Sequence, residues 1–166
     1  MKDTSSNDVA FVASSLRIGI VVSVYHSSVT ESLRDGALAA LSSVDIRGDD
    51  AVTVIDVPGA FEIPFAARRA AESGFFDAIV CLGCLIRGET PHFEYIASAV
   101  AHGVMAASQA TGLPITFGVL TTNSPAEAMT RAGQGASNKG WEAAIAAVQM
   151  VQIARKFKRK SEGASG

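Results

Sequence analysis

The chain has few charged residues and few cysteines, and it lacks a long apolar run. Charged residues make up 18% of its 166 residues, against about 25% in a typical soluble domain. Its 14 basic and 16 acidic residues nearly cancel, so no overall field attracts nucleic acid. No apolar run reaches the roughly 20 residues that span a bilayer. We expect neither a nucleic-acid partner nor a membrane partner.

Hydrophobic residues nevertheless make up 48% of the chain. With so few charges, this composition indicates surface that is buried between subunits; an alanine-rich monomer is the alternative. The first eight residues, MKDTSSND, are polar and lack the apolar core of a secretory signal. We therefore expect a homo-oligomer that is cytoplasmic or, as the alternative, soluble within an organelle.

The two cysteines, Cys81 and Cys84, form a C-x-x-C pattern that is typical of redox and zinc sites. They lie within a predicted strand, where positions three apart point to opposite faces. No second C-x-x-C is present to complete a zinc site. We interpret both as buried structural residues and predict no metal site.

Four apolar runs rich in β-branched residues are separated by helical stretches, which predicts an α/β fold. Because the runs are continuous rather than alternating, they predict a parallel sheet covered on both faces. The predicted strands are 17–25, 51–57, 77–86 and 114–120. The first predicted helix begins at 28 and continues to at least 41, and the others are 58–74, 90–112, 124–133 and 139–157. We expect one domain over 16–157, with 1–15 as a flexible arm or added strand and 158–166 as a disordered tail.

Three of the predicted helices have clear start signals. Ser28 to Glu31 reads as a capping box, with Ser28 as N-cap. Thr90 is the predicted N-cap of the third helix, with a proline after it. Ser124 and Glu127 form another capping box around a proline. The basic residues at 155–160 fit the C-terminal end of the last helix better than a nucleic-acid site.

The segment GCLIRGETPHF, residues 83–93, has almost the spacing of a nucleotide-binding P-loop. Glu89 replaces the lysine that a triphosphate needs, and bulky residues fill the loop, so we exclude an NTPase. The backbone amides of Glu89 and Thr90 nevertheless open a helix, where one phosphate group can bind.

His92 is the predicted second residue of that helix, at the carboxyl end of a central strand. The positive end of the helix favours the neutral imidazole, which can accept a proton beside the phosphate site. His26 follows the first strand, and its orientation stays open. Arg131 either binds phosphate or complements the end of a helix. Tyr25, Phe61 and Phe117 fall near strand ends, where aromatic side chains suit a planar heteroaromatic ligand.

Four stretches, in this order, resemble the lumazine synthases of riboflavin biosynthesis. The resemblance covers residues 16–157. The matching stretches are VPGAFEIP (57–64), GCLIRGETPHFEYIA (83–97), PITFGVLTT (114–122), and RAG with NKGWEAA (131–133 and 138–144).

The resemblance implies a flavodoxin-like three-layer α/β/α sandwich with a four-stranded parallel sheet. It implies active sites between adjacent subunits of a pentamer, and no cofactor. The implied reaction condenses 5-amino-6-(D-ribitylamino)uracil with 3,4-dihydroxy-2-butanone 4-phosphate and releases phosphate and water. The short loop at 133–138 resembles members that assemble twelve pentamers into a 60-subunit icosahedral shell; a free pentamer is the alternative.

The family pattern also implies roles for individual residues. His92 matches a proton-transferring histidine, Glu89 and Thr90 match the backbone phosphate site, and Arg131 matches a phosphate-binding arginine. Phe117 matches a residue from the neighbouring subunit. Seven residues match positions that bind the pyrimidine and the ribityl chain: Tyr25, Ala60, Phe61, Glu62, Cys84, Leu85 and Ile86. Lys139 and Glu142 match two supporting residues near the site.

The chain departs from the family pattern at the end of the first strand. Many members have Arg-Phe-Asn or Arg-Trp-Asn there, whereas this chain has Val24, Tyr25 and His26. Tyr25 keeps the aromatic face that stacks on the pyrimidine. A relative that binds lumazine or flavin without catalysis is the alternative function.

Overall fold

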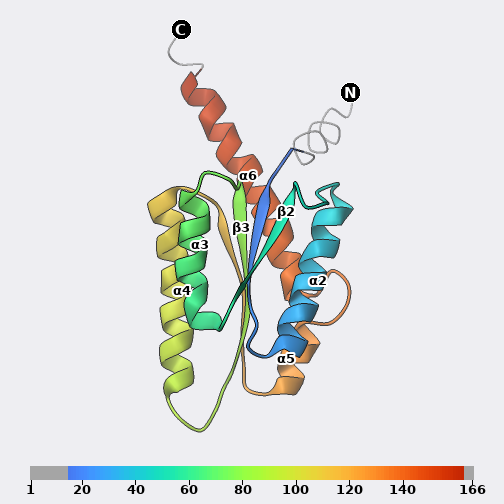
Figure 1. Cartoon of the computed structure of the whole chain (residues 1–166), viewed down its shortest axis with the longest axis vertical. Coiled ribbons are helices and arrows are strands. Elements are labelled where there is room, and N and C mark those ends of the chain that lie inside the picture. The colour runs from blue at the N-terminus through green and yellow to red at the C-terminus, as the bar shows by residue number, and fades with distance from the viewer. Residues whose placement is uncertain (1–14, 163–166) are drawn as a thin grey trace.

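The computed structural model describes residues 15–162, which form one parallel sheet between two layers of helices (Figure 1). The strand order is β2-β1-β3-β4. All three pairings are parallel. The strands are β1 (Ile18–Ser23), β2 (Val52–Val57), β3 (Ala78–Ile86) and β4 (Ile115–Thr122). The four predicted strands and the α/β fold are therefore confirmed.

Helices cover both faces of the sheet (Figure 1). One layer contains α3 (Ile63–Glu72) and α4 (His92–Thr111), with a short 3₁₀ turn, η1 (Ala60–Glu62), before α3. The other layer contains α2 (Ser27–Ser43), α5 (Pro125–Arg131) and α6 (Lys139–Glu162). In the described part of the chain, no helix is both long and apolar enough to cross a membrane.

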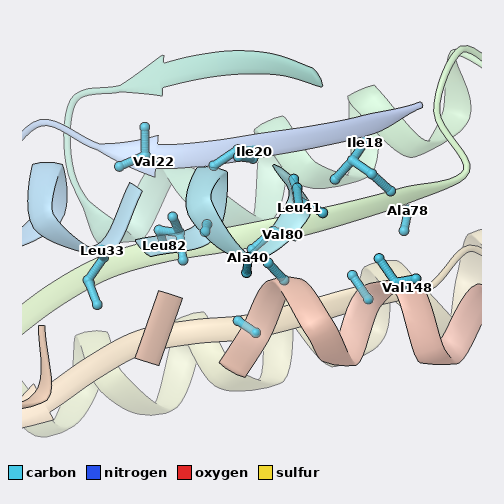
Figure 2. Packing of buried hydrophobic residues seen from close by; sticks show 14 of the residues in the cluster. Ile18, Ile20, Val22, Leu33, Ala40, Leu41, Ala78, Val80, Leu82 and Val148 are labelled. Atoms are coloured by element: carbon cyan, nitrogen blue, oxygen red, sulfur yellow. The ribbon is translucent and has the colours of Figure 1, made fainter. Parts of the chain in front are cut away.

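The sheet separates two hydrophobic cores. Ile18, Ile20 and Val22 of β1 pack toward α2 and α6, where Figure 2 shows Leu33 and Leu41 among their neighbours. The alternate β1 residue Val21 belongs to the core on the α3 and α4 side. Because both faces of β1 are fully buried, its sequence is continuously apolar, as expected for a central parallel strand.

Two predicted helix starts are wrong by one or two residues. The N-cap of α2 is His26, not Ser28, and the His26 carbonyl accepts hydrogen bonds from Val29 N (2.9 Å) and Thr30 N (3.1 Å). The N-cap of α4 is Pro91, not Thr90, because Pro91 has a ψ of 3°, outside the helical range. His92 is consequently the first residue of α4 rather than the second.

A third predicted start, at 58, is wrong by more, because residues 60–62 form the 3₁₀ turn η1 and α3 begins only at Ile63. Ser124 caps α5 by accepting a hydrogen bond from Glu127 N at 3.2 Å, as predicted. Helix α4 ends at Gly112, which has a φ of 67°, a conformation that favours glycine. Helix α6 continues to Glu162, beyond its predicted end at 157, and residues 163–166 of the predicted tail lie outside the described residues. No glycine or proline interrupts this segment before Gly163. The predicted arm, except Ser15, lies outside the described residues.

Candidate active site

A cavity of about 570 Å³ lies at the carboxyl ends of β1 and β3. The helices that follow these adjacent strands, α2 and α4, cover opposite faces of the sheet (Figure 1). This is the crevice where open α/β sheets bind ligands. We call it the His92 cavity. Eight predicted site residues line it: Tyr25, Ala60, Phe61, Glu62, Leu85, Ile86, Thr90 and His92.

The loop of residues 87–91 connects β3 to His92 and presents backbone donors. The amides of Gly88, Glu89 and Thr90 make no hydrogen bond within the described residues, and all three residues are exposed. His92 follows within the same turn and is also exposed. Unpaired amides at the start of a helix suit an anion. The geometry therefore places a potential proton acceptor beside a potential phosphate site.

Aromatic side chains form a wall of the His92 cavity. Tyr25 and Phe61 are 67% and 59% exposed, which is unusual for such large apolar groups. The Tyr25 and His26 rings meet edge to face, with centroids 4.6 Å apart. His26 adopts a left-handed backbone conformation, with a φ of 59°, and it lines the same cavity. The orientation that the sequence left open is thus toward the site.

A second cavity, of about 630 Å³, lies along β4 and α6. We call it the Arg131 cavity. Arg131 comes from the end of α5, and Lys139 and Glu142 come from the first turn of α6. The Lys139 Nζ lies 2.8 Å and 2.7 Å from the two Glu142 carboxylate oxygens. Arg131 forms no ion pair within the described residues, so it is available to an anion.

Phe117 lines the Arg131 cavity, not the His92 cavity. We predicted it near a strand end beside Tyr25 and Phe61, which is wrong. It is the third residue of β4, in register with Cys81, because β4 continues to Thr122. Its side chain is 45% exposed. Within one chain, the predicted site residues other than Cys84 and Glu89 therefore fall into two separate cavities.

The side chains of Cys84 and Glu89 line neither of these cavities. Cys84 is buried in the core on the α2 and α6 side, whereas Cys81 is buried in the other core. The opposite orientation predicted for the pair is confirmed. Burial raises the pKa of the Cys84 thiol to about 11 and that of the Cys81 thiol further still. In the described residues, no three or more His, Cys, Asp or Glu side chains form a group that could bind a metal.

Comparison with known proteins gives a family for this arrangement. The family model for 6,7-dimethyl-8-ribityllumazine synthase matches residues 15–155. The chain belongs to the lumazine synthase family. A lumazine synthase from Syntrophus aciditrophicus (strain SB) is 47% identical over 146 residues, which cover 88% of this chain and 94% of the relative. The resemblance found in the sequence is confirmed.

In this lumazine synthase family member, a buried residue between Arg131 and Lys139 has a role that was not predicted from the sequence. Asn138 is 2% exposed. Its side-chain oxygen accepts hydrogen bonds from Gly140 N (2.7 Å) and Trp141 N (3.2 Å), and so caps α6. Its side-chain nitrogen donates to the carbonyls of Ser32 (3.0 Å), Ala132 (3.0 Å) and Gly133 (2.8 Å). An asparagine directly before a helix is a signal that could have identified this cap.

Arg87 was considered only as one of the residues that are too bulky for a P-loop, so the contacts of its side chain were also missed. Its guanidinium pairs with Glu94 in the first turn of α4. The pKa of the Glu94 carboxyl lies below its usual range, chiefly because the residue's own backbone amide donates to the carboxylate, and then because of Arg87.

Proposed function

We propose that this chain condenses 5-amino-6-(D-ribitylamino)uracil with 3,4-dihydroxy-2-butanone 4-phosphate to give 6,7-dimethyl-8-ribityllumazine, the penultimate step of riboflavin biosynthesis. The observation that carries the proposal is the placement of His92 beside three unpaired loop amides, in a cavity with an exposed aromatic wall. The match to the lumazine synthase family over residues 15–155 supports it. A cytoplasmic location belongs to the same proposal.

The reaction requires several proton transfers, which a neutral histidine can perform. The 5-amino group of the uracil attacks the ketone carbon, and the carbinolamine loses water to give an imine. The hydroxyl-bearing carbon next to the imine loses its proton to give an enamine, whose electron pair expels inorganic phosphate as the carbon–oxygen bond breaks. The enol that remains takes up a proton on carbon and becomes a ketone. The ribitylamino nitrogen then closes the second ring, with loss of another water. His92 accepts protons from the attacking nitrogens and returns them to the departing oxygens, a contribution of about 10²–10⁴-fold in comparable enzymes.

The phosphate group is bound from two sides in this proposal. The amides of residues 88–90 contact it from the His92 cavity, and Arg131 supplies the cation. One phosphate monoester needs less positive charge than a triphosphate does, so Glu89 can occupy the lysine position of a P-loop. Only its backbone amide is used. The aromatic faces of Tyr25 and Phe61 stack on the pyrimidine.

Arg131 and Phe117 lie in a different cavity from His92, so we propose that a neighbouring copy of the chain completes each site. A ring of five subunits presents the Arg131 cavity of one copy to the His92 cavity of the next. Twelve such pentamers form a 60-subunit shell. The exposed apolar residues near the Arg131 cavity, including Phe117 (45%) and Met150 (44%), suit burial in such contacts.

The direct test is to mix the protein with both substrates and follow the absorbance and fluorescence of the lumazine product. Turnover is the expected result. Binding of lumazine or flavin without product formation would favour the alternative of a sequestering protein. The same preparation should release no phosphate from ATP, because the loop lacks the P-loop lysine.

A further inference from the structure

The loop of residues 87–91 is fixed by its backbone only at its two ends. At one end, Arg87 N donates to the Thr122 carbonyl at 2.9 Å. At the other end, the Pro91 carbonyl accepts from Glu94 N at 3.1 Å. The three amides between them have no partner in the described part of the chain. Something besides the backbone must hold these donors and His92 in place, because an unrestrained loop loses conformational freedom when it binds a ligand.

The Arg87 side chain connects the segments on either side of this loop. Its Nε donates to the side-chain oxygen of Asn123 at 3.1 Å, directly after β4. Its Nη1 donates to the Glu94 carboxylate. The guanidinium carbon lies 4.6 Å from the centroid of the Phe93 ring. Phe93 and Glu94 are the two residues that follow His92 in α4, so one side chain ties the histidine's helical turn to the end of β4.

The far side of this connection is itself anchored. Asn123 N donates to the Glu127 carboxylate at 2.9 Å, and Glu127 lies in the first turn of α5. Arg87 therefore bridges α4 to a segment that has its own support. An arginine suits this role because its planar guanidinium can donate in two directions and pack on a ring at once, which a lysine cannot do.

We propose that Arg87 is a positioning residue that holds the loop amides of residues 88–90 and His92 in the geometry required for the reaction. The inference rests on the proposed function of the His92 cavity. Arg87 is not among the described residues that line that cavity, although Phe93, which it contacts, is. It acts through Phe93, Glu94 and Asn123 rather than on the substrate.

The exposure of the Arg87 and Glu94 side chains allows a positioning role to be distinguished from a role in global stability. The side chains of Arg87 and Glu94 are 47% and 50% exposed, and half-exposed ion pairs contribute little to global stability. Small misplacements of reacting groups, in contrast, reduce rates by large factors. Loss of Arg87 should therefore change catalysis and local loop motion far more than it changes the unfolding transition.

The experiment compares Arg87→Met with the wild type in two ways. In steady-state kinetics we expect kcat to fall about 10-fold and the KM for the phosphorylated substrate to rise about 10-fold, with the KM for the uracil changed less than about twofold. In hydrogen exchange without substrate, the amides of 88–92 should exchange faster than in the wild type, and inorganic phosphate should protect them less. Arg68→Met is the matched control, because Arg68 pairs with Glu72 at 2.8 Å on α3, outside both cavities.

Glu94→Gln distinguishes positioning from direct binding of phosphate by Arg87. If Arg87 positions the loop, Glu94→Gln weakens the same connection and lowers kcat, as Arg87→Met does. If Arg87 binds phosphate itself, Glu94→Gln frees the guanidinium, and the KM for the phosphorylated substrate stays the same or falls. That second result would overturn the inference. Unchanged loop exchange together with unchanged kinetics in Arg87→Met would overturn it as well.

A wild-type protein that makes no product would refute the proposed function, whereas the hydrogen-exchange measurement would still test the role of Arg87 because it needs no turnover.

Arg87→Lys replaces Arg87→Met if the latter does not fold. It keeps the charge but cannot reach Asn123 and Glu94 together, so the same changes are expected with smaller amplitude. Wild-type behaviour of Arg87→Lys in both measurements would count against the role.

Discussion

At the scale of single residues, replacing His92 and replacing Arg131 are expected to change different kinetic constants. His92→Ala should lower kcat about 10²-fold without abolishing turnover, because two substrates that are already reactive are still held together. Arg131→Ala should chiefly raise the KM for the phosphorylated substrate, since a charge-assisted hydrogen bond contributes about 1.5–3 kcal/mol. Steady-state kinetics with each substrate varied in turn measures both effects. An unchanged kcat in His92→Ala would remove this histidine from the mechanism.

The two thiols should be unreactive in the folded protein. Burial raises the pKa of Cys84 to about 11, so near pH 8 only about one thiol in a thousand is ionised. Cys81 is buried in the opposite core and its pKa is raised further. We expect a thiol-specific reagent to label neither residue at pH 8 and to label both after unfolding in urea. Rapid labelling of the native protein would show that one of them is accessible.

At the scale of elements, Asn138 connects the start of α6 to α2 and to the loop after α5. Its side-chain NH₂ group shares two hydrogens among the carbonyls of Ser32, Ala132 and Gly133. The start of α6 packs closely against α2, because a Cβ atom added at Gly140 would lie 1.9 Å from the Leu33 carbonyl oxygen. The position of Lys139, and of the Arg131 cavity as a whole, depends on this one buried amide.

Asn138→Asp separates the two functions of this side chain. The carboxylate retains the acceptors that cap α6, but it replaces a donor with a negative oxygen facing three carbonyls. We expect a loss of about 3 kcal/mol or more in the free energy of unfolding, measured as a lower urea midpoint with an unchanged slope. Gln134→Glu makes the same chemical change at an exposed residue of the same loop, and it should leave the midpoint nearly unchanged. Equal midpoints for the two variants would refute this account of Asn138.

The succession of strands and helices along the chain could be predicted because the central strands β1 and β3 are apolar on both faces and glycines or capping residues separate the helices. Details that depend on tertiary contacts could not. His26 caps α2 through its carbonyl in a left-handed conformation, which the Ser28 capping pattern conceals. Nothing local in the sequence shows that Phe117 faces a different cavity from Tyr25. The guanidinium contacts of Arg87 reach Asn123, 36 positions away.

At the scale of the whole molecule, low charge and a large exposed apolar area indicate that more surface is buried on assembly. Phe65 and Met105 are 74% and 61% exposed, which a monomer has no reason to present to water. We expect light scattering to give the mass of a 60-subunit shell. A mass of five subunits would support the free pentamer instead, and a monomer would contradict both.

The central claim is that each active site takes His92 from one chain and Arg131 from its neighbour. The variants His92→Ala and Arg131→Ala test it when they are unfolded together in equal amounts and refolded as mixed assemblies. Activity is assayed with the phosphorylated substrate near its wild-type KM and far below the raised KM of Arg131→Ala, where each variant alone has low activity. In a ring of head-to-tail contacts, about a quarter of the shared sites then receive both wild-type residues. Native mass spectrometry, with one variant isotopically labelled, confirms that the chains have mixed.

The account predicts that the mixed assemblies recover about a quarter of the wild-type activity, far above either variant alone, because the sites are shared between neighbours. If each site lay within one chain, every chain in the mixture would still lack one of the two residues. Activity no greater than the average of the separate variants, in assemblies shown to be mixed, would contradict the account.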